Sequence, residues 1–108
     1  MSERARLEEQ TRRNLDGMGL EREGQIDRAV ELYEQSIAEG FEGDWPYGRL
    51  VAYYERQQRW GDAERVLQRA IEVFKASKRR TPEDRRATLK AFRGRLRLVQ
   101  KGARGAAP

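Results

Sequence analysis

The sequence repeats itself at a constant offset. Between residues 20 and 37, four residues recur unchanged 34 positions later: Glu21, Arg22, Ala29 and Ile37 reappear as Glu55, Arg56, Ala63 and Ile71. Similar residues match in the same register, among them Leu20 with Tyr54 and Tyr33 with Leu67. A period of about 34 residues is typical of stacked helical hairpins, in which each unit buries its apolar side on the next. We therefore expect an all-α structure that holds a partner rather than converting a substrate.

Glycines predict the ends of the first two helices. The first helix is expected to begin after Ser2, which can serve as its N-cap, and to end at Gly24. The second is expected to run from about Asp27 to Gly40, because glycine has no Cβ and readily adopts the left-handed conformation that ends a helix.

Two further helices are predicted in the middle of the chain. Asp44 is the expected N-cap of the third helix, and Pro46 is tolerated in its first turn. Its predicted buried side consists of Tyr47, Leu50, Val51 and Tyr54. The fourth helix should follow a short turn at 59–61 and bury Ala63, Val66, Leu67, Ala70, Ile71 and Phe74.

A fifth helix is predicted to start at Thr81 and Pro82. A capping hydroxyl, a proline at the first helical position and two carboxylates in the first turn are strong start signals. Two sides are distinct, one apolar with Leu89, Phe92, Leu96 and Val99, and one basic with Arg86, Lys90, Arg93, Arg97 and Lys101. Residues 102–108 contain no core-forming side chain and are predicted to be a disordered tail.

Composition argues against catalysis. The chain has no Cys and no His, which removes disulfides, thiol nucleophiles, imidazole acid–base chemistry and nearly all zinc ligand sets. No enzyme activity, metal or cofactor is therefore expected. No apolar run approaches the ~20 residues of a membrane span, and the charged opening lacks the apolar stretch of a secretory signal. A cytoplasmic location is the corresponding expectation.

Charge is distributed unevenly along the chain. Residues 1–54 carry 7 basic and 12 acidic side chains, a net charge of −5, whereas residues 55–108 carry 16 and 6, a net charge of +10. The basic half can attract acidic protein or nucleic acid, and the acidic half can attract another copy of the chain.

The second unit resembles the tetratricopeptide repeat. Its signature is followed in outline by Tyr47, Leu50, Tyr54, Ala63 and Leu67. The first unit matches in part, with Gly17 at the small-residue position and Ala29 in the second helix. Phe41-Glu42-Gly43 and the following Pro46-Tyr47 are also similar to a small bacterial variety of paired repeats.

The resemblance implies a right-handed solenoid of helical hairpins within residues 1–101. Repeats at about 10–43 and 44–77 would be followed by a capping helix at about 82–101. In the family, the first helix of each pair lines a concave groove that binds a peptide. The implied groove residues are Asn14, Met18 and Arg22 from the first helix, Arg49, Ala52 and Arg56 from the third, and Arg86, Lys90 and Arg93 from the fifth.

Guanidinium groups suit an acidic or amphipathic peptide, because their fixed fork of donors binds carboxylates in pairs. The same arginines can instead be solvated side chains, some paired with Glu21 and Glu55 at helical spacing. The sequence leaves two alternative functions open. The basic fifth helix can contact nucleic acid, and oppositely charged surfaces can join two copies into a homodimer or larger scaffold.

Overall fold

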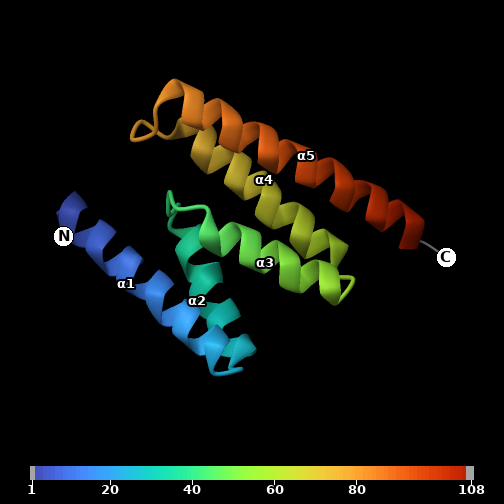
Figure 1. Ribbon diagram of the computed structural model, residues 1–108, viewed down its shortest axis with the longest axis horizontal. Helices are drawn as coiled ribbons and strands as arrows, with labels where there is room; N and C mark the ends of the chain where they lie inside the picture. The colour runs from blue at the N-terminus through green and yellow to red at the C-terminus, as the bar shows by residue number, and fades with distance from the viewer. Residues whose placement is uncertain (1, 107–108) are drawn as a thin grey trace.

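The protein is all-α over the residues that the structure describes. The computed structural model describes residues 2–106, in which five helices follow one another without a strand (Figure 1). Their bounds are α1 Glu3–Arg22, α2 Ile26–Ala38, α3 Trp45–Arg56, α4 Trp60–Ala76 and α5 Pro82–Ala106. The predicted number and order of helices are therefore confirmed, and none of these helices is both long and apolar enough to cross a membrane.

Side-chain caps start the first and last helices as predicted. The Ser2 hydroxyl accepts a hydrogen bond from the Ala5 amide at 3.0 Å, and the Thr81 hydroxyl accepts one from the Asp84 amide at 3.1 Å. Each bond satisfies an amide that has no partner within the helix. Asp44 is the N-cap residue of α3 as predicted, although its carboxylate makes no cap hydrogen bond.

The turn that joins α1 to α2 recurs between α3 and α4. Gly24 and Gln58, which occupy equivalent positions in the two units, both have positive φ, +78° and +57°. In each turn the amide of the next residue reaches back to the preceding helix, Gln25 to the Leu20 carbonyl and Arg59 to the Tyr54 carbonyl, both at 2.8 Å. The local backbone structure therefore repeats at the period found in the sequence.

Neighbouring helices pack in chain order, α1 on α2, α2 on α3, α3 on α4 and α4 on α5. The buried core runs along these contacts. Ala29 and Ala63, matched by the repeat, are fully buried, and their small side chains let adjacent helices approach closely. The molecule measures 19 Å along its shortest axis, which is room for about two layers of helix.

The last helix is longer than the sequence predicts. Residues 102–106 continue α5 instead of forming a tail, whereas residues 107 and 108 lie outside the described residues. Gly102 lies directly against Trp60. A Cβ at this position would be only 3.0 Å from the indole ring. Contact with this ring at the start of α4 gives the final turns of α5 a surface to pack on, which the composition of the segment did not reveal.

Candidate interaction groove

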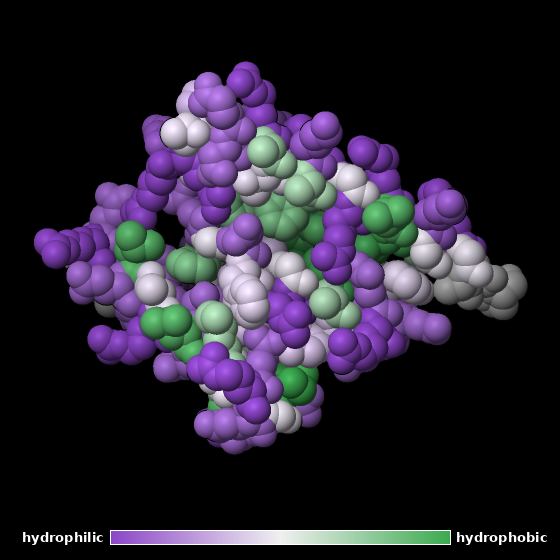
Figure 2. All heavy atoms as spheres, viewed as in Figure 1, coloured by the Kyte–Doolittle hydropathy of each residue, from purple (hydrophilic) through white to green (hydrophobic). Residues whose placement is uncertain are grey.

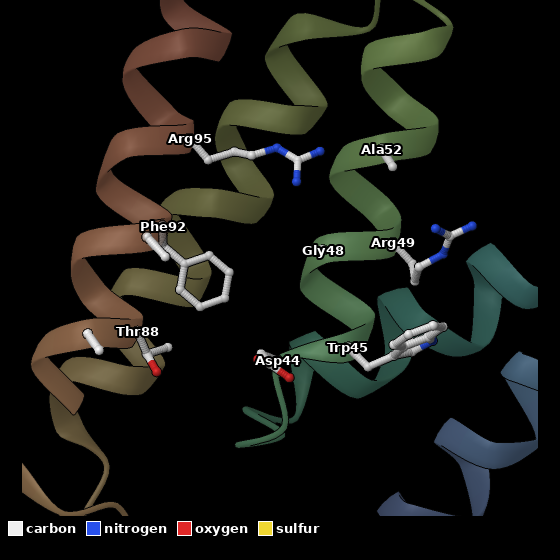
Figure 3. A pocket seen from close by; sticks show the side chains of 10 residues that line it. Asp44, Trp45, Gly48, Arg49, Ala52, Thr88, Phe92 and Arg95 are labelled. Atoms are coloured by element: carbon white, nitrogen blue, oxygen red, sulfur yellow. The ribbon is translucent and has the colours of Figure 1, made fainter. Parts of the chain in front are cut away.

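A hollow of about 540 Å³ lies between α3 and α5, with α4 behind it (Figure 3). We call it the α3/α5 groove. Hydrophobic residues are exposed in this part of an otherwise largely hydrophilic surface (Figure 2). One wall consists of Asp44, Trp45, Gly48, Arg49 and Ala52, and the other of Ala87, Thr88, Ala91, Phe92 and Arg95.

Small residues line both walls and leave the space between α3 and α5 unfilled. Gly48 and Ala52 on α3 lie four residues apart, as do Ala87 and Ala91 on α5. Residues at this spacing share one side of a helix, so each wall presents a strip with little side-chain volume. A Cβ built at Gly48 would meet nothing within 4 Å, which shows that this glycine is not required for packing.

Aromatic rings form the floor of the groove. Phe92 points from α5 toward α3 (Figure 3), stacks on Phe74 with ring centroids 5.4 Å apart and meets Tyr47 edge-on at 6.1 Å. Phe74 and Tyr47 are fully buried, and the Tyr47 hydroxyl donates to the Phe41 carbonyl at 2.8 Å. The floor is therefore apolar and firmly packed, and Phe92, 9% exposed, is the ring of the three that borders the groove.

The two ends of the groove differ in charge. Asp44 is exposed at one end and makes no ion pair within residues 2–105. At the other end Arg95 binds Glu55, with Nε 3.1 Å from Oε1, and both side chains remain partly exposed. Arg56 follows Ala52 by one turn of α3, is exposed and has no carboxylate within 4.0 Å among the described residues; its guanidinium lies 5.9 Å from the Tyr53 ring centre.

A hydrogen-bonded cluster fixes the α3 wall. We call Glu21, Tyr33, Trp45, Arg49 and Tyr53 the Glu21 network. The Glu21 carboxylate, only 9% exposed, accepts hydrogen bonds from both tyrosine hydroxyls and from Arg49 Nε at 2.8 Å. The Trp45 indole donates to the Tyr33 hydroxyl at 3.0 Å. The network thereby ties α1, α2 and α3 together at one point.

The protonation states of the network follow from these bonds. Burial alone would raise the pKa of the Glu21 carboxyl, but the hydrogen bonds from Tyr33, Tyr53 and Arg49 outweigh burial and hold this pKa below its usual value. Burial, together with the hydrogen bond to Glu21, raises the pKa of the Tyr33 and Tyr53 hydroxyls. At neutral pH an ionised carboxylate therefore faces two neutral phenols and a charged guanidinium.

Arg49 is positioned differently from the sequence-based prediction. The resemblance placed it in the groove as a ligand-binding cation, but its guanidinium points away from α5 (Figure 3) and is engaged by Glu21. It also lies 5.6 Å from the Trp45 ring centre and 5.1 Å from that of Tyr53. The sequence suggested pairing with Glu21 only at helical spacing, whereas the pair observed joins α3 to α1.

The predicted α1 residues do not line the α3/α5 groove. Asn14 and Met18 are half-buried and contact each other, with Nδ2 3.9 Å from Sδ, and Arg22 is exposed in the last turn of α1. α1 packs mainly on α2 and makes at most marginal contact with α3. Of the six residues predicted from α1 and α3, Arg49 and Ala52 line the groove, whereas Arg56, one helical turn beyond Ala52, does not.

The predicted α5 residues lie outside the groove as well. Arg86, Lys90 and Arg93 are exposed. The α5 residues that face α3 are instead Ala87, Thr88, Ala91, Phe92 and Arg95. The reason is the apolar side of α5: turning Leu89, Phe92 and Val99 onto α4 rotates the basic side away from α3. The small residues four apart on both helices were the available sequence signal for the true walls.

Comparisons with protein-family models, characterised proteins and solved structures find no match for this chain. Among the described residues there is also no cluster of three or more acidic side chains placed to hold a metal ion.

Proposed function

We propose that the chain is a non-catalytic protein-interaction module whose α3/α5 groove binds an amphipathic, acidic segment of another protein. In this proposal α1–α2 and α3–α4 are two tetratricopeptide-like units of a solenoid, and α5 is its capping helix. The recurrence of both residues and turn hydrogen bonds at the same offset supports that arrangement.

The make-up of the groove is the observation that carries the proposal. Phe92 offers an apolar floor, Trp45 at the outer edge of the α3 wall is 42% exposed with its ring directed away from α5, and Arg95 extends from α5 toward α3. Aromatic residues and arginine are the types enriched at protein interfaces and at the positions that contribute most to binding. The ligand is expected to place a large apolar side chain over Phe92.

Charge favours an acidic ligand. Arg95, paired with the partly exposed Glu55, lies at one end of the groove, Arg56 follows one turn beyond Ala52 on α3, and the chain has no acidic residue after Asp84. A ligand carboxylate at that end would form a charge-assisted hydrogen bond with either guanidinium. Asp44 at the other end disfavours a second carboxylate there, so the acidic part of the ligand should lie beside Arg56 and Arg95.

The α3 wall and the floor of the groove are held in place by contacts within the protein. The Glu21 network holds Trp45 and the backbone of α3 in place before any ligand arrives, and the stacked Phe74 holds Phe92. A wall that is already ordered loses little conformational entropy on binding, which increases affinity for a given contact area.

Selection of peptides from a random library on the immobilised protein tests this proposal. Enriched peptides should combine a large apolar residue with acidic residues, and they should lose at least tenfold in affinity for Gly48→Leu, which fills the groove. Gly61→Leu is the matched control, because Gly61 also has open space around its Cβ position and lies outside the groove. Calorimetric titration of each variant gives the affinities.

A charge reversal locates the acidic end of the ligand. Arg56→Glu should weaken binding, whereas Arg22→Glu, the equivalent position of the first unit, should not. Selected peptides that bind Gly48→Leu as tightly as they bind the wild type would exclude the α3/α5 groove.

A further inference from the structure

α5 carries a row of cations on the side that faces neither α4 nor the groove. We call Arg86, Lys90, Arg93, Arg97, Lys101 and Arg104 the basic stripe. All six side chains are exposed, and successive members are three or four residues apart. At about 100° per residue the six positions fall within an arc of about 80°, and at 1.5 Å per residue they extend over about 27 Å.

The charge of the basic stripe is not neutralised by the described part of the chain. The only ion pair that its members make there joins Arg86 to Glu83 at 4.0 Å, between two side chains that are 75% and 78% exposed. Elsewhere arginines meet carboxylates across helices, as Arg13 meets Glu39 and Arg65 meets Glu34. Like charges four residues apart destabilise a helix, so a row of this kind is not explained by the stability of α5.

We propose that the basic stripe binds the phosphate backbone of a nucleic acid. A duplex presents about one negative charge per 1.7 Å of its axis, so about 27 Å of duplex offers enough phosphates for all six cations. Four of the six are arginines, whose donor fork matches phosphate oxygens. Contacts of this kind position a protein without reading base sequence.

The surroundings of the stripe favour a nucleic acid over the other acidic partners. A protein interface needs an apolar centre, and the one large exposed apolar side chain on the described part of α5, Leu98 at 68%, lies beside the basic stripe and not within it. A membrane-surface helix needs an apolar side free to insert, and that side of α5 is buried: Leu89 is 8% exposed and Val99 2%. This inference does not depend on the α3/α5 groove, which lies on another side of α5.

Fluorescence anisotropy of a labelled 20-base-pair duplex tests the proposal. The wild type should bind at 50 mM salt, and affinity should fall by about 10³-fold at 200 mM if all six cations meet phosphates. The triple variant Arg93→Gln, Arg97→Gln, Lys101→Gln should bind at least tenfold more weakly at 50 mM, and its salt dependence should be shallower by about three phosphate contacts.

The control variant makes the same change of net charge elsewhere. Arg6→Gln, Arg12→Gln and Arg28→Gln remove three exposed cations from α1 and α2 and should leave duplex affinity within about threefold of the wild type. Circular dichroism of both variants should show unchanged helix content.

Three results would overturn the proposal: no duplex binding by the wild type at 50 mM salt, equal losses in the two triple variants, or binding to anionic phosphatidylserine vesicles in the absence of duplex binding. Peptides selected on the groove should bind the stripe variant normally, so failure here leaves the groove proposal intact.

Discussion

The Glu21 network and the basic stripe use arginine in opposite ways. In the network, Arg49 binds a carboxylate that is 9% exposed and so fixes α1 and α2 to α3. In the stripe, exposed cations follow one another with a single weak pairing among the described residues. The difference teaches that an arginine paired with a buried carboxylate of another helix is committed to the fold, whereas an exposed cation without such a partner is available to a ligand. Arg49 holds the fold together, and the stripe carries the charge that a ligand can use.

The largest effect that separates the two regions should come from Glu21→Ala. It leaves two hydroxyls and a guanidinium without their shared acceptor, which should cost about 2–4 kcal/mol in the free energy of unfolding. The cost stays below the highest values for buried ion pairs because Arg49, 37% exposed, can turn to water. Urea unfolding measures it, with the exposed Glu23→Ala as control. Equal stabilities of the two variants would show that the network does not hold the helices together.

Replacing a glycine by alanine should destabilise the protein beside the Glu21 network but stabilise it in α5. An alanine methyl at Gly17 would lie 2.5 Å from Tyr33 Cε1, and the network restrains that ring, so Gly17→Ala should destabilise the protein by about 1–3 kcal/mol. At Gly94 in α5 the nearest atom is 3.8 Å away, at the flexible end of Arg97. Gly94→Ala should therefore stabilise by about 0.5–1 kcal/mol. Thermal unfolding followed by circular dichroism compares them, and shifts of the same sign would contradict the packing described for Gly17.

Acidic pH should reduce the contribution of the Glu21 network to the free energy of unfolding, because the network contains a carboxyl group and the basic stripe contains none. Because the pKa of folded Glu21 lies below its usual value of 4.5, its ionised form stabilises the protein above that pH, and the contribution is lost as pH falls through the folded pKa. The difference in unfolding free energy between wild type and Glu21→Gln should consequently shrink between pH 6 and pH 3. Other carboxylates titrate in both proteins and largely cancel in the difference. A gap that stays constant over this range would mean that Glu21 acts only as a neutral acceptor.

Local signals predicted the helices well, because each depends on a few adjacent residues. Thr81 and Pro82 mark the start of α5 whatever lies around them, and Gly24 and Gly40 supply positive φ where the chain turns. The end of α5 was missed because its cause is distant in the sequence: Trp60, at the start of the preceding helix, packs on Gly102.

The candidate site was harder to predict because it depends on pairings between helices. Nothing in the sequence marks Glu21 as the partner of Arg49, 28 residues away, rather than any other carboxylate. The rotation of α5 likewise depends on how deeply Phe92 packs on Phe74, which decides that Arg95 and not Arg93 lines the groove. The residue types therefore predicted that arginines would make the polar contacts of this region. Which of several similar arginines lines the groove could be known only from the structure.

The smallest effect on stability should come from the basic stripe itself. Arg93→Gln, Arg97→Gln and Lys101→Gln remove exposed charges that have no carboxylate partner among the described residues, so each should change the free energy of unfolding by less than about 0.5 kcal/mol. The sum should be slightly stabilising, because the like-charge pair of Arg97 with Arg93 and that of Arg97 with Lys101 are both relieved. Urea unfolding at 20 mM and 300 mM salt checks this, since salt should narrow the small gain. A loss of more than about 1 kcal/mol would place these side chains among the interactions that hold α5 on α4, and the contrast with the Glu21 network would fail.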